Sequence, residues 1–231
     1  MIERVLNDFD IDQIANSGQC FRFHRVGDKS YNLIAGTHLL NIQQNGRTVR
    51  FDCDEDEFNA IWRPYFDLDT DYGRCKAAKR DTYLQNAVAY GGGLRILRQD
   101  LWETILCFII SQQNNIARIT KCVENLCSLF GETCYNKSEQ VYNSIPTAER
   151  LAACTPEDLA PVRLGYRAKY IHRLIQDVLA GTVSLESLAA LPPDKAMTAL
   201  TSLYGIGPKV ANCVCLFGLH HIDAFPVDTW I

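Results

Sequence analysis

The hydrophobic pattern of the chain changes its period near Gly91–Gly93. Before these glycines, apolar and polar residues alternate with the period of two that is typical of a strand with one buried face. After them, apolar residues recur every three or four positions, as on one face of a helix. We therefore predict an α+β protein, with a twisted antiparallel sheet in an N-terminal α+β domain over residues 1–97 and an all-helical domain over residues 98–231.

The alternation in the N-terminal part is clearest around Phe21 and Phe23 and resumes on both sides of Asn45-Gly46. An Asn-Gly pair between two alternating runs is the strongest two-residue hairpin signal. We expect the antiparallel sheet over residues 15–55 and helices over residues 56–90.

The C-terminal part carries helix signals of its own. Asp100 and Glu103 form a capping box that opens an apolar helix to about Ser111. Another helix is predicted from Lys169 to Ala180, where a glycine follows. Between these two lies a helix closed by a glycine, whose apolar stripe comprises Ile116, Ile119, Val123 and Leu126.

The composition is that of a folded protein: 47% of the 231 residues are hydrophobic and 22% are charged. No apolar run is long enough to span a bilayer, and the first ten residues resemble neither a signal peptide nor a transit peptide. We expect a soluble intracellular monomer, cytoplasmic in a bacterium or nuclear in a eukaryote. The ten cysteines include no C-x-x-C and no structural zinc spacing, so we expect buried reduced thiols.

The net charge of −4 argues against a protein that coats nucleic acid by bulk charge. It leaves room for a local anion site, because backbone N–H groups at a helix start can hold a phosphate without any net positive charge.

Such a site is predicted at Gly205-Ile206-Gly207-Pro208. Two glycines permit a tight turn after a helix that ends near Tyr204, and Pro208 suits the first position of the next helix. A dinucleotide-binding loop is excluded, because a helix precedes the turn and the third glycine would fall at Val210. Two interpretations stay open, a structural turn between helices and a helix–hairpin–helix that binds DNA phosphate.

Three side chains near this hairpin carry candidate chemistry. Lys209 lies in the first helical turn, where the helix dipole and burial both favour the neutral, nucleophilic amine. Cys213 follows one turn later on the same face. Asp228 comes nineteen residues after Lys209 and suits the N-cap of a helix that starts at Thr229. A lysine and a carboxylate together suit a reaction with a cationic sugar transition state.

These residues resemble the helix–hairpin–helix (HhH-GPD) superfamily of DNA glycosylases and, within it, the 8-oxoguanine DNA glycosylases/AP lyases. The matching segments span nearly the whole chain in the family's order. They are Ser17–Arg22, Ile96–Asp100, Asn114–Ile119, Leu164–Ala168, Lys209–Cys215 and Pro226–Asp228.

The resemblance implies a role for each matched residue and no cofactor. Lys209 attacks C1′ of the damaged nucleoside, and Asp228 supports the sugar cation and the activation of the lysine. Gly18 accepts the N7–H of 8-oxoguanine through its carbonyl, and Cys213 stacks on the flipped base. The implied DNA contacts are Gln113, Asn114, Arg118, Tyr166 and Arg167, and the backbone N–H groups of Gly205, Gly207 and Val210. The carbonyls of Thr201, Leu203 and Ile206 match a monovalent cation site.

The implied substrate is duplex DNA that contains an oxidised purine, preferably opposite cytosine, and the implied process is base excision repair. Gln113 replaces the asparagine that is common in relatives, and Trp230 stands where many carry a phosphate-contacting histidine. In the family, helices that complete the base pocket follow the position of Ile231, so we expect the helical domain to continue there.

Three other functions fit parts of the sequence. Relatives that excise alkylated bases use water as the nucleophile and lack the lysine at position 209. An iron–sulfur branch needs four closely spaced cysteines after Asp228. A non-catalytic DNA-binding helix–hairpin–helix explains Gly205 and Gly207 but explains neither the pair of Lys209 and Asp228 nor the segment around Gly18.

Overall fold

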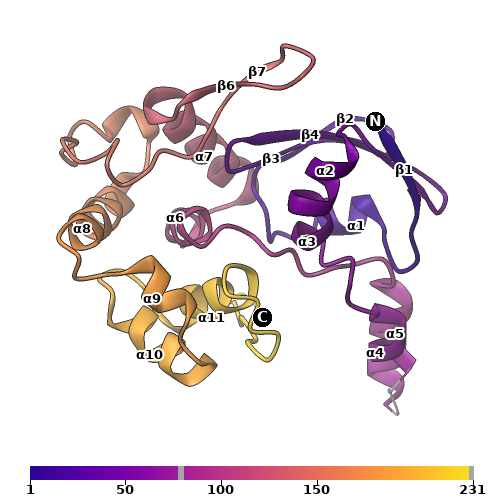
Figure 1. Ribbon diagram of the computed structural model, residues 1–231. Helices are drawn as coiled ribbons and strands as arrows, with labels where there is room; N and C mark the ends of the chain where they lie inside the picture. The colour runs from indigo at the N-terminus through magenta and orange to yellow at the C-terminus, as the bar shows by residue number, and fades with distance from the viewer. Residues whose placement is uncertain (78–80, 229–231) are drawn as a thin grey trace. The chain divides into compact units, whose positions relative to one another are not determined.

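The computed structural model describes residues 1–77 and 81–228. Its internal contacts divide the chain into two compact units, coloured by residue number in Figure 1. The first unit comprises Met1–Ile34 and Leu39–Arg98, and the second comprises Ala35–His38 and Gln99–Ile231.

An antiparallel sheet forms the first unit, as the alternating pattern predicts. Its strands lie in the order β1-β5-β4-β3-β2. Gly46 and Arg47 form the two-residue turn that joins β4 to β5, because Asn45 is the last residue of β4 and pairs with Thr48. The turn thus lies one residue later than Asn45-Gly46, and Gly46 adopts a φ of +56° there. The strands are β1 (Ile2–Val5), β2 (Phe23–Gly27), β3 (Ser30–Ala35), β4 (His38–Asn45) and β5 (Thr48–Phe51).

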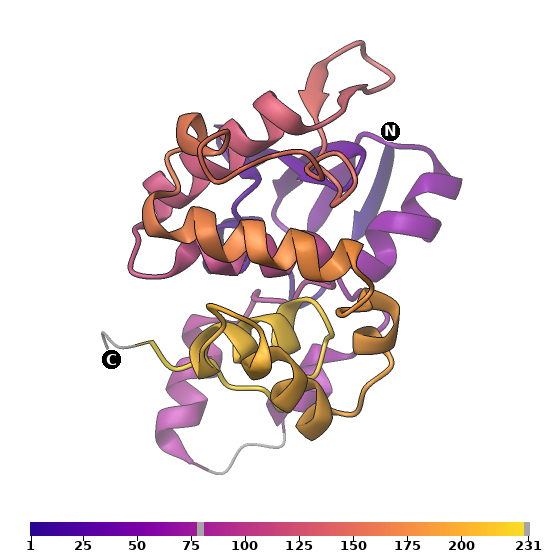
Figure 2. The ribbon, with the colours of Figure 1, turned by 90° about the vertical axis from the view of Figure 1, so that its left-hand side faces the viewer.

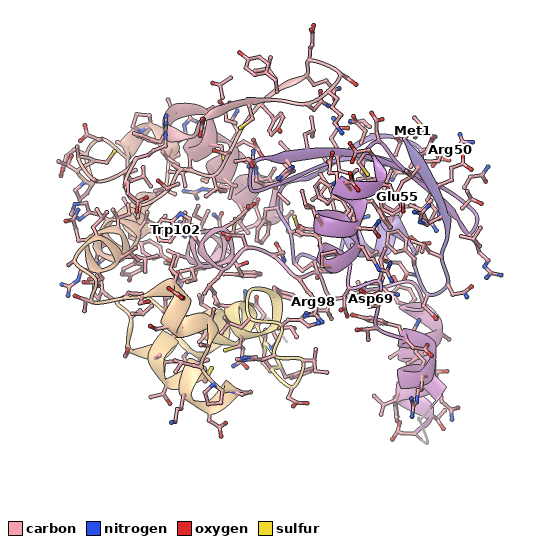
Figure 3. All side chains as sticks on the ribbon, viewed as in Figure 1. Met1, Arg50, Glu55, Asp69, Arg98 and Trp102 are labelled. Atoms are coloured by element: carbon pink, nitrogen blue, oxygen red, sulfur yellow. The ribbon has the colours of Figure 1, made fainter. Side chains whose placement is uncertain are left out.

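The edge strand β1 lies outside the predicted range and pairs with β5. Charged side chains line this edge, where Arg50 Nε lies 2.6 Å from Glu3 Oε1 and Arg4 pairs with Glu55 (Figure 3). The sequence pattern did not identify β1, because the strand has only four residues and two of them are charged. Charged side chains are typical of a protected sheet edge.

Helices pack on the sheet, and their aromatic side chains fill its core. Phe51 contacts Phe58 and Phe66 edge to face, with ring centroids 5.0 and 6.0 Å apart. The prediction of helices over residues 56–90 is confirmed in the described part of that range. The helices are α1 (Ile11–Ala15), α2 (Glu55–Glu57), the π-helix η1 (Phe58–Trp62), α3 (Arg63–Tyr65), α4 (Tyr72–Ala77) and α5 (Thr82–Tyr90).

The second unit is built around α6 (Leu101–Ser111), in which every residue after Leu101 is buried. Asp100 caps this helix as predicted by accepting a hydrogen bond from the N–H of Glu103, while the Glu103 carboxylate accepts from the N–H of Gly36. Helices α7, α8 and α11 pack around α6 (Figure 2). In the described ranges, no helix is both long and apolar enough to cross a membrane.

The other elements of this unit are mostly short helices, as expected. They are α7 (Ile116–Phe130), η2 (Ala160–Val162), η3 (Gly165–Arg167), α8 (Ala168–Leu179), α9 (Leu185–Ala189), α10 (Pro193–Ser202) and α11 (Pro208–Phe217), with a hairpin of β6 (Thr133–Tyr135) and β7 (Val141–Asn143). The sequence reading missed this hairpin, whose three-residue strands carry little periodicity. It also placed Ile116 in the buried stripe of α7, whereas 60% of that side chain is exposed.

The predicted turn between α10 and α11 depends on one glycine in particular. Gly205 has a φ of +86°, and a Cβ atom added there would lie 2.3 Å from Cγ of the Tyr170 ring. Gly207 has a φ of −93° and open space around it, so of the two glycines that permit the turn, Gly205 alone adopts a left-handed conformation.

We predict that Gly205→Ala destabilises the second unit more than Gly181→Ala. Gly181 has a φ of +71° and no atom within 4 Å of an added Cβ, so this control measures backbone strain alone, about 1–2 kcal/mol. Gly205→Ala adds displacement of the Tyr170 ring, for which overpacking costs of about 1–3 kcal/mol are typical. Urea unfolding measures both, and equal losses would contradict the close packing at Gly205.

Candidate active site

Lys209 and Asp228 come together at the start of α11. Lys209 follows Pro208, the first residue of the helix, and its Nζ lies 3.4 Å from Asp228 Oδ2. The side chains are 32% and 45% exposed, so a substrate can reach both. Nζ also lies 5.7 Å from the ring centroid of Phe108 on α6. The helix expected at Thr229 and the residue Trp230 lie outside the described residues.

A pocket of about 250 Å³ surrounds this pair. It brings four further candidates, Gln113, Asn114, Gly207 and Val210, to the same place as the lysine and the aspartate. Its lining residues are Ser111, Gln112, Gln113, Asn114, Gly207, Pro208, Lys209, Val210 and Asp228.

The first turn of α11 forms one wall of this pocket and is suited to an anion. Gly207 occupies the N-cap position and has no side chain with which to cap the helix. The first N–H groups of a helix have no partner within it, and they lie at the positive end of the helix dipole. A phosphate at Gly207 and Val210 would therefore find donors without a basic side chain.

The opposite wall is the turn after α6, which holds a strained residue. Gln113 has a φ of +45°, a region that residues other than glycine seldom occupy. The side chain of Gln112 donates a hydrogen bond to the carbonyl of Gly205 at 3.0 Å and so ties the turn to the hairpin. Sequence reasoning missed Gln112, because nothing in the pattern distinguishes it from Gln113.

Arg167 holds the same turn through its backbone carbonyls. It is 3% exposed. Its guanidinium donates hydrogen bonds to three backbone carbonyls. Nε lies 2.9 Å from the carbonyl oxygen of Gln112, and the terminal nitrogens lie 3.1 Å from those of Gln113 and Leu164. These carbonyls use its donors and compensate its buried charge. In this structure the side chain of Arg167 is bonded to the turn, and its contact with DNA stays a prediction.

Arg118 and Tyr166 are accessible, in contrast to Arg167. Arg118 is an exposed residue of the first turn of α7. Tyr166 is 44% exposed, and its hydroxyl lies 3.4 Å from the carbonyl of Gln112. The ring of Tyr170, which contacts those of Tyr166 and Tyr204 edge to face, supports this surface.

Cys213 is buried at 3% exposure, one helical turn after Lys209. Burial raises the pKa of its thiol to about 11, with a further rise from Asp228 and an opposing effect of Lys209. The thiol is therefore neutral near pH 7. A neutral, polarisable group suits packing against an apolar surface better than nucleophilic attack.

Gly18 lies in the first unit, in the turn that precedes β2. Its φ of +77° requires a residue that tolerates the left-handed region, and an added Cβ would meet nothing within 4 Å. The buried side chain of Gln19 fixes this turn by accepting from the N–H of Leu97 at 2.8 Å and donating to the carbonyl of Arg95 at 2.9 Å. Gln19 is a second residue whose role the sequence pattern does not indicate.

The carbonyls of Thr201, Leu203 and Ile206 lie at the end of α10 and in the hairpin, and the carbonyl of Leu203 accepts from the N–H of Ile206 at 3.1 Å. Neutral oxygen donors at a helix C-terminus suit a hard cation. Among the described residues, no group of three His, Cys, Asp or Glu side chains could hold a metal ion.

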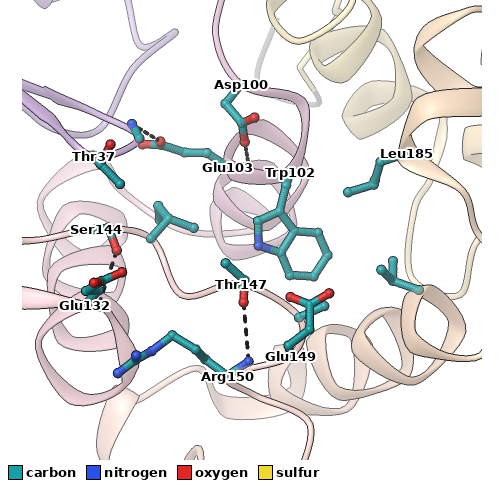
Figure 4. A pocket seen from close by; sticks show the side chains of 14 residues that line it. Thr37, Asp100, Trp102, Glu103, Glu132, Ser144, Thr147, Glu149, Arg150 and Leu185 are labelled. Carbon is teal, nitrogen blue, oxygen red and sulfur yellow. Dashed lines mark hydrogen bonds between the residues drawn. The ribbon is translucent and has the colours of Figure 1, made fainter.

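A larger pocket, about 370 Å³, lies at the other end of α6 and is lined by none of the candidate residues (Figure 4). Its polar groups bond to the protein: the Trp102 indole donates to the carbonyl of Pro146, and the Thr147 hydroxyl accepts from the N–H of Arg150.

Comparison with known proteins matches the chain along its full length. The N-glycosylase/DNA lyase of Saccharomyces cerevisiae is 40% identical over 249 aligned positions, which cover 94% of this chain and 65% of the yeast protein. The chain thus spans just under two thirds of that relative's length.

Two solved structures of the 8-oxoguanine glycosylase/lyase of Clostridium acetobutylicum superpose with a TM-score of 0.93 each. The apo form is 38% identical, with 98% of this chain and 80% of that chain covered. The complex with double-stranded DNA containing cytosine opposite 8-oxoguanine is 37% identical, with 98% and 79% covered.

Two family models divide the sequence between them. Residues 1–105 match the N-terminal domain of 8-oxoguanine DNA glycosylase, and residues 106–231 match the HhH-GPD superfamily of base excision DNA repair proteins. The second model covers more than half of the chain. The chain therefore belongs to the HhH-GPD superfamily of base excision DNA repair proteins and carries the N-terminal domain of its 8-oxoguanine DNA glycosylases.

Proposed function

We propose that this protein is a bifunctional DNA glycosylase and AP lyase that removes 8-oxoguanine from duplex DNA, preferably opposite cytosine. The observation that carries the proposal is the 3.4 Å contact of Lys209 with Asp228 in a pocket beside an uncapped helix start. The activities named for the yeast and clostridial relatives support it. We further propose that it acts inside the cell as a monomer and needs no cofactor.

Lys209 acts as the nucleophile in this proposal. Its neutral amine forms a bond to C1′ of the sugar while the glycosidic bond breaks, and the electrons of that bond leave with the base. The nitrogen loses a proton, and opening of the sugar ring gives an imine, from which β-elimination cleaves the strand. Asp228 stabilises the positive charge on the sugar, because its carboxylate lies beside the attacking atom.

The base must leave the duplex before this reaction, at a cost of a few kcal/mol. The carbonyl of Gly18 accepts the N7–H of 8-oxoguanine, whereas guanine presents a lone pair there. A site built around one hydrogen bond strongly rejects the analogue that lacks it. The buried, neutral thiol of Cys213 packs against the flipped base.

Backbone groups of the hairpin hold the DNA strand. The N–H groups of Gly205, Gly207 and Val210 bind phosphate at the start of α11. A monovalent cation would be held by the carbonyls of Thr201, Leu203 and Ile206 and would bring positive charge to this phosphate site. Gln113 fills the space that the flipped base leaves, and Asn114 contacts the DNA.

Replacement of the nucleophile tests the central step. Lys209→Gln should abolish covalent trapping by borohydride on a duplex that contains 8-oxoguanine, because an amide nitrogen forms no imine. Binding to the same duplex should persist, since the hairpin N–H groups are unchanged. Trapping that survives in this variant would identify another nucleophile and refute the proposed role of Lys209.

A second variant separates charge from shape at Asp228. Asp228→Asn keeps the size of the side chain and removes the negative charge, so single-turnover excision should slow by at least about 100-fold, the lower end of what a positioned acid or base contributes. The melting temperature should change little. A near-normal excision rate would leave Asp228 with a structural role only.

We assign the preference for cytosine opposite the lesion to Arg118, with the ring of Tyr166 wedged against the neighbouring base stack. Orphaned cytosine offers two acceptors to the guanidinium fork, whereas adenine places a donor against it. Native protein should favour cytosine over adenine by about 1–3 kcal/mol, the usual scale for a wrong base. Arg118→Ala should reduce that ratio of single-turnover rates, and Arg173→Ala, which removes an exposed arginine paired with Asp177, should not. Equal rates on both duplexes in native protein would contradict the assignment.

A further inference from the structure

Asn212, a residue of α11, bonds to the segment that carries Asp228. Asn212 Nδ2 donates to the carbonyl of Pro208 at 2.9 Å, and Asn212 Oδ1 accepts from the N–H of Phe225 at 3.2 Å. Pro208 immediately precedes Lys209, and Phe225 lies three residues before Asp228. One amide group therefore connects the backbone beside the lysine to the backbone beside the aspartate.

Apolar burial does little to hold this segment in place. Ile222, Phe225 and Val227 are 70%, 78% and 54% exposed. The earlier part of the segment is bonded to the helix end through the N–H of His221, which donates to the carbonyl of Cys215 at 2.8 Å. Closer to Asp228, the N–H of Ala224 donates to the carbonyl of His221 at 2.9 Å within the segment, and the N–H of Phe225 donates to Asn212 on α11.

Asparagine is well matched to this position. The bridge needs a donor toward the Pro208 carbonyl and an acceptor for the Phe225 N–H on one short side chain, and the amide of asparagine supplies both. An ionised aspartate supplies only acceptors, and alanine supplies neither. The bond to Pro208 also spans four residues of the helix, so it orients the side chain toward the segment.

We infer that Asn212 is a positioning residue that holds the segment of Asp228 and thereby sets the contact between Asp228 and Lys209. The inference rests on the proposed function, in which that contact carries the chemistry. Asn212 touches no reacting atom, so its effect is on the rate of base removal rather than on the binding of DNA.

The experiment compares Asn212→Ala, Asn212→Asp and Asn59→Ala with native protein. Asn212→Asp keeps the acceptor for Phe225. Asn59→Ala is the control, because Asn59 Nδ2 also donates to the carbonyl four residues earlier, that of Glu55, at 2.9 Å. Asn59 is remote in sequence from the active-site residues. Hydrogen–deuterium exchange of residues 219–228, the dissociation constant for lesion DNA and single-turnover excision are measured for each.

In Asn212→Ala, exchange of residues 219–228 should be faster, and excision should fall by about 10- to 100-fold, the scale of a reacting group displaced by up to 1 Å. DNA affinity should stay within about twofold of native. Relative to Asn212→Ala, Asn212→Asp should restore part of the exchange protection and part of the rate, because the bond to Phe225 persists while the bond to Pro208 is lost. Asn59→Ala should change neither.

Unchanged exchange in Asn212→Ala would overturn the inference, as would faster exchange with a native excision rate. A rate that falls only in proportion to DNA affinity would point to a merely structural role and would also overturn it. If native protein removed no base, the proposed function would fail by itself, and the exchange comparison would still decide whether Asn212 holds the segment.

Discussion

The position of Lys209 depends on how closely the backbone of Gly205 approaches the ring of Tyr170. Any side chain at Gly205 would overlap that ring, and any L-residue would be strained at its φ of +86°. Because the turn is this tight, α11 begins only three residues later, with its free N–H groups and Lys209 on the pocket side. The same close approach supports Tyr166, whose ring contacts that of Tyr170. One glycine thus fixes the hairpin, the start of the helix and part of the surface.

In the proposed function, an acidic protein binds a polyanion through a positive potential that is local. The net charge is −4, yet the pocket presents helix N–H groups and one lysine beside one aspartate. Within one turn of α11, the environment changes from the partly exposed Lys209 to the buried Cys213. Burial keeps the thiol protonated, whereas Lys209 is accessible to a substrate. In the proposed function, this difference separates the group that reacts from the group that packs.

Periodic and turn signals predicted most of the fold. The hairpin of β4 and β5, the helix capped by Asp100 and the helix–hairpin–helix each follow from strong local preferences, although the β4–β5 turn lies at Gly46-Arg47, one residue after the predicted pair. Elements that depend on pairing with distant residues were missed, namely β1 and the hairpin of β6 and β7, since short strands gain their stability from partners rather than from pattern. Ile116 is exposed because it begins α7, ahead of the buried stripe.

Residue type alone could not separate side chains that face the substrate from those that support them. Arg118 and Arg167 both lie in segments that resemble the same family. The guanidinium of Arg167 donates hydrogen bonds to backbone carbonyls, whereas Arg118 is exposed in the first turn of α7. Gln112 and Gln113 differ in a similar way, because the side chain of Gln112 donates to the carbonyl of Gly205 whereas Gln113 is exposed. A buried polar side chain is held by the hydrogen bonds it makes, so it can fix the position of the backbone around it. An exposed polar side chain is available to contact a ligand. The partners of the side chains, which only the structure supplies, therefore decide which of the two roles each residue has.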